Sequence, residues 1–265
     1  MARESLDTMR LAICAVIRNE ARYLREWIEF HRLMGVGRFH LYNRSEDDTL
    51  AILEPYMAAG IVELIDWPML PPCQIQAYQH YIDSQQGKSR WTAFIDADEF
   101  LWSPRYQTVT EALESFPKEW PSVAVNWMCF GSSGKRERED APVIERFTWR
   151  PSAEISSNHY VKAIVRMGRH FTMHDPHYAN LPTFTPSGRL NSGSHSVPHE
   201  HGVLRINHYG CKSRQEWLER QLNGKPFGSG APGPEECYDE IQGMDVDDRE
   251  IQRYLPALKE RLALP

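Results

Sequence analysis

Three carboxylates, Asp96, Asp98 and Glu99, directly follow an apolar run at residues 91–95. The run is aromatic and β-branched, which predicts an interior strand of a covered sheet. Ligands of an open α/β sheet bind in the crevice beyond the carboxyl ends of its strands, so Asp96 and Asp98 are expected to reach into it. Two carboxylates one residue apart suit a hard divalent cation, which prefers oxygen ligands and can bridge to nucleotide phosphates. The same two acids could instead only cap the turn after the strand.

The segments before these acids alternate between strand and helix patterns. Apolar strand patterns lie at residues 11–17, 38–42 and 61–67, and helix patterns with 3.6-residue spacing follow them at residues 24–33, 50–59 and 74–85. Strands that alternate with helices predict a parallel sheet with right-handed crossovers. The expected fold class is therefore α/β, with a mostly parallel central sheet flanked by helices.

Several different short motifs follow one another in a fixed order between residues 11 and 101. They are Arg18-Asn19-Glu20, residues 23–31, the turn 45–49, Asp66-Trp67-Pro68 and residues 94–100, with thinner matches at residues 126–134, Lys162, residues 207–209 and Lys212-Ser213. This set resembles glycosyltransferase family 92 and its bacterial relatives in the family-2-like group. The resemblance implies a GT-A fold and a bacterial enzyme that uses Mn²⁺ (or Mg²⁺) to move a sugar from a nucleoside diphosphate donor, a UDP-sugar, to a glycan or lipid-linked acceptor.

The resemblance also implies a metal site. Asp98 is expected to bind the metal directly, and Asp96 to face the ribose or a metal-bound water, although the two roles could be exchanged. His208, between an apolar strand at residues 202–207 and a basic segment, corresponds to the histidine that the family places before a basic helix start. Neutral imidazole can complete a shell of carboxylate, phosphate and histidine around Mn²⁺. A surface or capping role is the alternative for His208.

The nucleoside is expected at the ends of the first two strands. By the resemblance, Asn19 and Glu20 lie near the base or ribose, and Asn43 and Asp47 lie around the base edge. The sequence departs from the family-2-like pattern at Asn43-Arg44, where two acidic or small residues are more usual. This departure leaves the identity of the base open.

Basic side chains are expected at the diphosphate. The resemblance assigns this role to Lys162, Lys212 and Arg214, which would neutralise phosphate oxygens. An inverting transferase also needs a carboxylate that takes the proton from the acceptor hydroxyl, whereas a retaining one does not. Asp175 is the preferred base, and the other candidates are Glu145, Asp140 and Glu200.

Composition is typical of a single-domain intracellular enzyme. The chain has 265 residues, 41% of them hydrophobic, and we expect one domain, with a nucleotide-binding half at about 10–125 and an acceptor half with C-terminal helices at about 126–265. The net charge of −6 argues against a nucleic-acid partner. Five cysteines without paired spacing predict reduced thiols in the cytoplasm. No apolar run spans a bilayer, so we expect at most peripheral association through a lipid-linked acceptor.

Two other function classes remain open. A nucleotidyltransferase or sugar-nucleotide pyrophosphorylase would be expected to show a Gly-rich basic loop after its first strand, where this chain has Arg18-Asn19-Glu20. A non-catalytic carbohydrate-binding protein could keep the fold without the metal.

Two segments are predicted to be loops. The histidine-rich segment 170–201 is predicted to be a loop over the acceptor site rather than a zinc site, and residues 228–234 are predicted to form a mobile loop.

Overall fold

The computed structural model describes residues 9–68, 73–85, 88–223 and 241–263 of the chain. Among these residues, one sheet of ten strands forms the frame, in the order β12-β11-β6-β8-β4-β1-β2-β3, and β13 pairs with both β6 and β5. Its strands are β1 (Met9–Ile17), β2 (Arg38–Asn43), β3 (Val62–Asp66), β4 (Ser89–Phe94), β5 (Glu99–Trp102), β6 (Ser122–Cys129), β8 (Val161–Arg166), β11 (Thr183–Phe184), β12 (Leu190–Asn191) and β13 (Arg205–His208).

The N-terminal half of the sheet has the predicted βαβ order. Strands β1, β2, β3 and β4 pair in parallel, and the helices α1 (Ala21–Leu33), α2 (Thr49–Ala58) and α3 (Cys73–Ser84) connect them. Each strand alternates its side chains between two faces, so β1 contributes Ile13 to the core beneath α1 and Cys14 to the core beneath α3. The strand and helix predictions for residues 11–95 are confirmed to within a few residues at each end.

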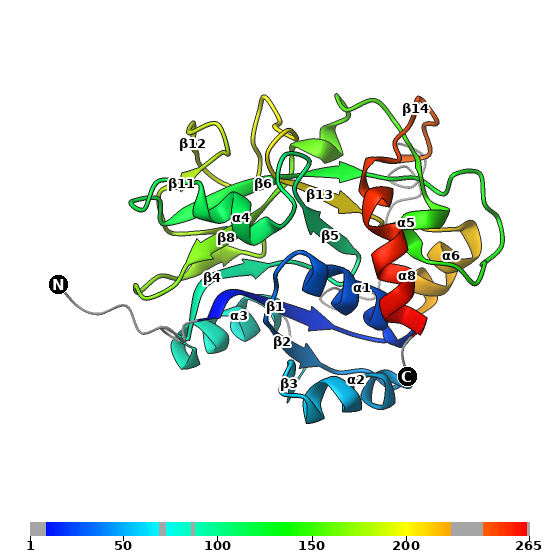
Figure 1. The fold of residues 1–265 in the computed structure, drawn as a ribbon, viewed down its shortest axis with the longest axis horizontal. Coiled ribbons are helices and arrows are strands. Elements are labelled where there is room, and N and C mark those ends of the chain that lie inside the picture. Colours follow the sequence, from blue (N-terminus) through cyan, green and yellow to red (C-terminus); the bar gives the residue numbers. More distant parts are fainter. Residues whose placement is uncertain (1–8, 69–72, 86–87, 224–240, 264–265) are drawn as a thin grey trace.

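The other half of the sheet is mixed. Strand β8 runs antiparallel to both β4 and β6, whereas β11 and β13 run parallel to β6. The sheet as a whole therefore keeps the expected class, α/β with a mostly parallel central sheet flanked by helices (Figure 1). The short elements of this half are α4 (Val109–Glu114), α5 (Val143–Arg146), β7 (Trp149–Arg150), η1 (Ser156–His159), β9 (Met173–Asp175) and β10 (Tyr178–Ala179).

The acidic segment connects strand β4 to strand β5. After β4 the chain turns through residues 95–98 and enters β5, which pairs antiparallel with β13. The register sets His208 opposite Glu99, and the Tyr209 amide donates a hydrogen bond to the Asp98 carbonyl at 2.9 Å. His208 is thus the last residue of β13, and backbone pairing brings it to the acids.

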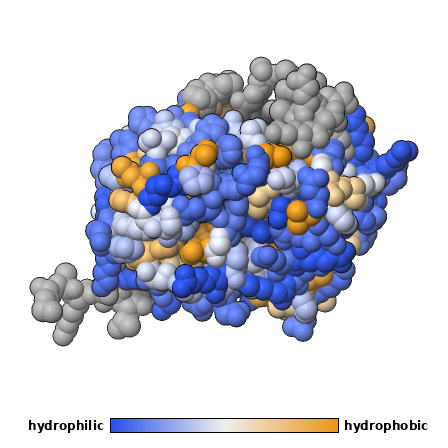
Figure 2. Space-filling view, turned by 90° about the horizontal axis from the view of Figure 1, so that it is seen from above, coloured by the Kyte–Doolittle hydropathy of each residue, from blue (hydrophilic) through white to orange (hydrophobic). Residues whose placement is uncertain are grey.

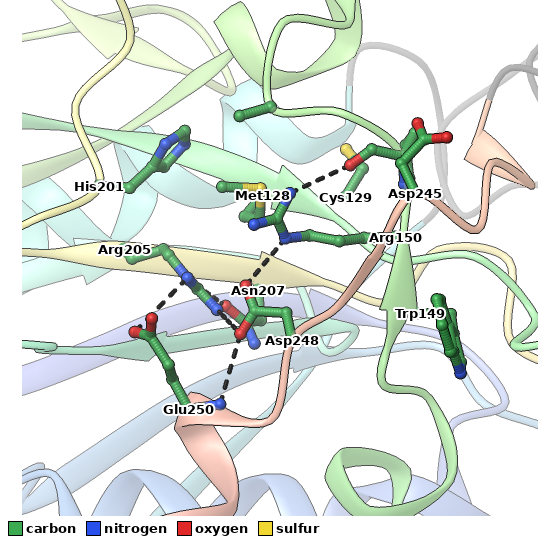
Figure 3. Close-up of polar contacts among 12 residues, drawn as sticks. Met128, Cys129, Trp149, Arg150, His201, Arg205, Asn207, Asp245, Asp248 and Glu250 are labelled. Carbon is green, nitrogen blue, oxygen red and sulfur yellow. Dashed lines mark hydrogen bonds and ion pairs between the residues drawn. The ribbon is translucent and has the colours of Figure 1, made fainter.

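The C-terminal segment packs onto this frame. It comprises α6 (Arg214–Asn223), β14 (Val246–Asp247), η2 (Glu250–Tyr254) and α8 (Leu255–Ala263), and α8 lies beside α1 (Figure 1). Figure 3 shows how the segment is fixed: the Asp248 carboxylate accepts from Arg150 Nε at 2.8 Å and from Arg205 Nη2 at 3.1 Å. The predicted loop at residues 228–234 lies outside the described residues.

The face seen in Figure 2 is largely hydrophilic, with small, separate hydrophobic patches. Scattered apolar side chains such as Leu190, which is 65% exposed, are usual on a protein surface. No helix in the described ranges combines the length and the apolar character that crossing a bilayer requires.

Candidate functional site

Asp98, His208 and Arg220 form the first part of the site. The Asp98 side chain is 3% exposed, and its Oδ2 lies 2.6 Å from Arg220 Nη1 and 3.6 Å from His208 Nε2. Burial alone would raise the pKa of Asp98, but the charges of Arg220 and His208 hold that pKa well below its usual range. Asp98 is therefore an ionised carboxylate, with a cationic side chain against it and an imidazole alongside.

Asp96, Glu99 and Lys162 form a second, adjoining cluster. The ammonium of Lys162 lies 2.7 Å from Asp96 Oδ2 and 3.5 Å from Glu99 Oε1. Gln74 donates to Asp96 Oδ1 at 2.8 Å, and the Asp96 amide donates to Glu99 Oε2 at 2.9 Å. Burial raises the pKa of Glu99 well above its usual value, against the opposing charge of Lys162. Lys162, predicted at the diphosphate, is fully buried and neutralises Asp96 here.

A cavity of about 450 Å³ lies where β1 passes into α1, facing the start of α6. It brings together four residues predicted from the sequence to bind the donor: Asn19, Glu20, Asp47 and Lys212. Burial raises the pKa of Glu20, against the lowering charges of Lys212 and Arg220. Arg220 also lines this cavity, so it connects the cavity to Asp98.

The loops on one side of the cavity are bound to each other. Asn19, with φ of 55°, donates its amide to Ser45 Oγ at 2.9 Å and accepts from the Glu46 amide at 2.8 Å. Asp47 Oδ2 accepts from the Ala21 amide at 3.1 Å. These hydrogen bonds fix the ends of β1 and β2 against each other. Asn43 does not line the cavity, and its Oδ1 accepts from the Ser45 amide at 3.0 Å.

Two basic groups in the cavity lack a carboxylate partner. Lys212 has φ of 53° and is 6% exposed, and its ammonium lies 4.3 Å from the centre of the Tyr23 ring. Among the described residues, that ammonium makes no ion pair within 4 Å and no hydrogen bond. The Nε of Arg18 is buried and also has no hydrogen-bond partner there. Burying a charged group without a direct hydrogen bond or ion pair is costly, and an anion in the cavity would supply one.

Other basic residues near the cavity are already paired. Glu216 forms a buried ion pair with Arg146 at 3.0 Å and accepts from the Tyr23 hydroxyl at 2.8 Å. Burial opposes ionisation, but hydrogen bonds from Arg146, Ser213 and Tyr23 lower the pKa of Glu216 to about 2. Arg214, predicted at the diphosphate, instead lies with its guanidinium 4.6 Å from the Trp217 ring and outside the lining of the cavity.

Arg220 is the site residue that the sequence-based prediction missed. It follows Glu216 by four residues on α6, so both side chains lie on one helix face. That spacing is the only signal in the sequence, and it is equally typical of an exposed helix pair. The contact between Arg220 and Asp98 spans 122 residues of chain, which no local pattern encodes.

Asp175, the predicted base, lies in the turn between β9 and β10. Its Oδ1 accepts from the amides of His177 and Tyr178 at 2.6 and 3.1 Å. The other candidates have partners elsewhere: Glu145 pairs with Lys259, Asp140 with Arg22, and Glu200 with Arg189 and Ser187. Within the histidine-rich segment, His199 and His201 bond to the carbonyls of Ala153 and Trp127.

The three predicted metal ligands, Asp96, Asp98 and His208, do not lie together in this structure. Within the described residues, no three His, Cys, Asp or Glu side chains lie close enough together to hold a metal ion. Asp98 and His208 meet, whereas Asp96 is bound to Lys162. A carboxylate and an imidazole are a suitable donor pair for Mn²⁺ or Mg²⁺ when phosphate oxygens supply further ligands. The pair Asp98 and His208 therefore fits a divalent cation if Arg220 moves away from Asp98.

Sequence comparison decides the family. The model for glycosyltransferase family 92 matches residues 10–227, which include both clusters and the cavity. The chain belongs to glycosyltransferase family 92. A family 92 protein of Ricinus communis is 28% identical over 206 residues, which are 75% of this chain and 35% of the relative. One of Oryza sativa subsp. japonica is 29% identical over 203 residues, 75% of this chain and 33% of the relative.

A third relative in family 92, from Arabidopsis thaliana, is 30% identical over 127 residues, 46% of this chain and 21% of the relative. The chain thus spans about a third of the length of the first two relatives. All three are plant proteins, so they give no support to the predicted bacterial origin.

Among solved structures, 4-diphosphocytidyl-2C-methyl-D-erythritol synthase from Anaerococcus prevotii aligns over 93% of this family 92 chain and 84% of its own, with 10% identity and a TM-score of 0.29. A TM-score this low supports no conclusion about shared fold or activity.

Proposed function

We propose that this family 92 chain transfers a sugar from a UDP-sugar to a hydroxyl of a glycan or lipid-linked acceptor, with inversion at the anomeric carbon. Membership of the family supports glycosyl transfer. The main structural support is the cavity at the end of β1, where Lys212 and Arg18 present positive charge with no carboxylate partner among the described residues. A diphosphate would supply the missing negative charge.

The donor would lie with its nucleoside against the bound loops of Asn19 and Asp47 and its diphosphate toward Lys212. Charge-assisted hydrogen bonds from a lysine and an arginine to phosphate oxygens are about twice as strong as neutral ones. Arg220 lies between the cavity and Asp98, so a bound diphosphate would compete with Asp98 for this guanidinium. In this proposal Arg220 keeps Asp98 neutralised until the donor arrives.

Asp98 and His208 are the proposed holders of Mn²⁺ or Mg²⁺. A divalent cation there would stabilise the negative charge that develops on the departing diphosphate. Asp96 remains the proposed contact to the ribose, with its orientation fixed by Gln74 and Lys162. Lys162 would then act on the diphosphate only through Asp96, as a positioning residue.

Asp175 remains the proposed base on the acceptor side. Its Oδ1 is held by two backbone amides, so Oδ2 is the oxygen that would take the proton of the attacking hydroxyl. The His177 ring beside it packs 5.4 Å from Trp127, whose own ring stacks on His208 at 4.2 Å. This row of rings links the turn of Asp175 to the proposed cation site.

We also propose a reducing compartment, the cytoplasm, with peripheral association through the acceptor. The four described cysteines, Cys14, Cys73, Cys129 and Cys211, are buried, and none forms a disulfide with another described cysteine. Thiols in such positions persist where disulfides do not form. Fractionation of the producing cells, followed by thiol counting on the denatured protein, tests this point.

A donor screen with the purified chain tests the function. UDP-, GDP- and TDP-sugars are offered with and without Mn²⁺, and released nucleoside diphosphate and glycosylated product are both measured. We expect UDP release with at least one UDP-sugar and stimulation by Mn²⁺. Release of pyrophosphate would instead indicate a nucleotidyltransferase. Failure of every nucleotide to bind in calorimetry would overturn the proposal and leave a carbohydrate-binding role.

A further inference from the structure

A second cavity, of about 370 Å³, lies between the β9–β10 hairpin and the β11–β12 hairpin. The described residues that line it include aromatic, amide and hydroxyl side chains, but no Asp, Glu, Lys or Arg. A cavity without charged walls gives no favourable partner to a phosphate or a carboxylate. Its chemistry suits a neutral ligand with many hydroxyl groups.

One wall of this cavity is aromatic. The rings of His174 and Tyr178 lie 5.5 Å apart between centres, with an angle of 35° between their planes. Tyr178 is half-buried, and its hydroxyl makes no hydrogen bond to another described residue. An aromatic ring with an apolar face and a polar tip can pack against the C–H face of a pyranose while its hydroxyl bonds to the sugar.

Two amide side chains also line the cavity, Asn180 next to β10 and Asn191 in β12. Asn191 is 8% exposed; its Nδ2 donates to the Gly193 carbonyl at 3.1 Å, and its Oδ1 accepts no hydrogen bond from the described residues. Asn180 Oδ1 accepts from the Thr172 amide at 2.7 Å, which leaves its Nδ2 available. Asn191 Oδ1 is not one of the buried atoms that lack a partner, so it reaches the solvent of the cavity, where it can accept a hydrogen bond from a ligand hydroxyl.

The cavity and a row of rings that leads to the proposed reaction site share the β9–β10 hairpin. Tyr178, in the cavity wall, is next in sequence to His177, whose ring lies 5.3 Å from Tyr160 and 5.4 Å from Trp127. Trp127 stacks on His208, which lies beside Asp98. Asp175 bonds to the amides of both His177 and Tyr178, so the proposed base and the cavity wall belong to one turn.

We infer that this cavity binds a neutral pyranose unit of the acceptor glycan, held by Tyr178 and Asn191. The inference deepens the proposed function, because it gives the acceptor a chemical class and a place on the chain. A sugar held there would present the neighbouring unit of the same glycan toward the turn of Asp175. An anionic glycan would find no Lys or Arg side chain in the lining, whereas the apolar side chains there, such as Leu181 and Pro182, can pack against the C–H groups of a sugar.

Direct binding tests the inference without relying on catalysis. Methyl β-glycosides of glucose, galactose and mannose, and the methyl glycoside of glucuronic acid as the charged control, are titrated by ligand-detected NMR. We expect at least one neutral glycoside to bind and the glucuronide not to bind. Tyr178→Ala and Asn191→Ala should each weaken binding by roughly tenfold, which is the loss of one aromatic face or one hydrogen bond.

Tyr178→Phe keeps the ring and should lose less than Tyr178→Ala, which separates packing from a general effect on folding. Gln76→Ala, an exposed amide on α3, is the matched control and should bind as the native chain does. UDP affinity, measured in parallel, should be equal in all variants. If no neutral glycoside binds the native chain, or if the variants bind as tightly, the inference is wrong even where UDP binds. If UDP does not bind but the glycoside does, the proposed function fails and the sugar site stands.

Discussion

Two buried clusters of charge in this chain are built in opposite ways. Around Asp248, Arg150 and Arg205 meet its carboxylate at 2.8 and 3.1 Å, and Glu250 lies 3.9 Å from Arg205, so two basic groups face two carboxylates (Figure 3). Around the cavity at the end of β1, the Lys212 ammonium packs on an aromatic ring without an ion pair, and the Arg18 Nε has no partner among the described residues. The first cluster pairs its charges directly, whereas the second contains two basic groups that make no direct ion pair within the described residues.

The difference separates a structural role from a binding role. A balanced buried ion pair is costly to break, because removing one member leaves the other charge buried and alone. A basic group without an ion pair loses no such partner when it is replaced, and it remains available to a negatively charged ligand. Substitutions in the first cluster should therefore change the free energy of unfolding, and substitutions in the second should change binding and turnover.

The largest effect is expected at the balanced cluster. Asp248→Ala leaves the guanidinium groups of Arg150 and Arg205 buried without a carboxylate, and should lower the free energy of unfolding by about 3–5 kcal/mol. Urea denaturation measures this loss. UDP affinity of the folded fraction should stay unchanged, and a weakened affinity with normal stability would reverse the assignment of the two clusters.

In the second cluster, around the cavity at the end of β1, Asp98→Asn keeps the size of the side chain and removes its charge. We expect donor turnover to fall by roughly 10²–10³-fold, the usual loss when one electrostatic contact to a transition state is removed. Initial rates of UDP release give the measurement. Asp83→Asn, an exposed carboxylate on α3, is the control and should keep native rates. Native turnover in Asp98→Asn would contradict the role of Asp98.

Glu26 sharpens the comparison, because it is a buried carboxylate bonded to backbone amides, of Val143 and Ile144, rather than to an arginine. Burial raises its pKa from 4.5 to about 7, so its contribution to stability is complete below pH 4.5 and is lost as the pH rises through 7. The loss amounts to about 3 kcal/mol.

Unfolding free energies of the native chain and Glu26→Gln at pH 5 and pH 8 test this direction: the native chain should lose stability relative to the variant as the pH rises. Glu29, one helix turn further on, pairs with Arg32 and Arg261. Although burial opposes it, these partners lower the pKa of Glu29, so its contribution is lost as the pH falls. The pKa of Glu29 lies below 4.5, so this loss is measured between pH 5 and pH 3, where the native chain should lose stability relative to Glu29→Gln as the pH falls. A difference between the native chain and Glu29→Gln that does not change over this range would count against the argument.

The smallest effect is expected at Lys212. Lys212→Met keeps the length of the side chain and its packing on Tyr23, but removes the charge that the diphosphate would meet. UDP affinity should fall by roughly tenfold, in the range of one charged hydrogen bond, while the melting temperature should not fall. Calorimetry and thermal melting give the two readings. Lys259→Met, at an exposed ion pair with Glu145, is the control.

Much of the N-terminal half was predictable from local pattern. The alternation of apolar residues sets β1 to β4 and their helices, because these elements pair with near neighbours in sequence through short crossovers. The meeting of Asp98 and His208 was expected from family resemblance alone. The mixed half was not predictable in the same way, because β8 enters antiparallel between β4 and β6 and takes Lys162 to Asp96.

The roles within the site depend on such long-range pairing. Asp96 and Asp98 are two residues apart, yet one faces Lys162 from β8 and the other faces Arg220 from α6. The sequence shows two similar carboxylates, and only the packing of distant elements makes them different. The pairing of Lys162 with Asp96 could not be read from the sequence for the same reason, and the role of Lys162 at the diphosphate remains a prediction.

Two side chains of helix α1, one turn apart, form hydrogen bonds with the backbone of strand β5. Trp27 Nε1 donates to the Glu99 carbonyl at 2.8 Å, and His31 Nε2 accepts from the Leu101 amide at 3.0 Å. The helix begins at the wall of the first cavity, and the strand begins next to Asp98. These two hydrogen bonds therefore hold the cavity wall and the acidic segment on the same helix, which limits how far either can shift without the other.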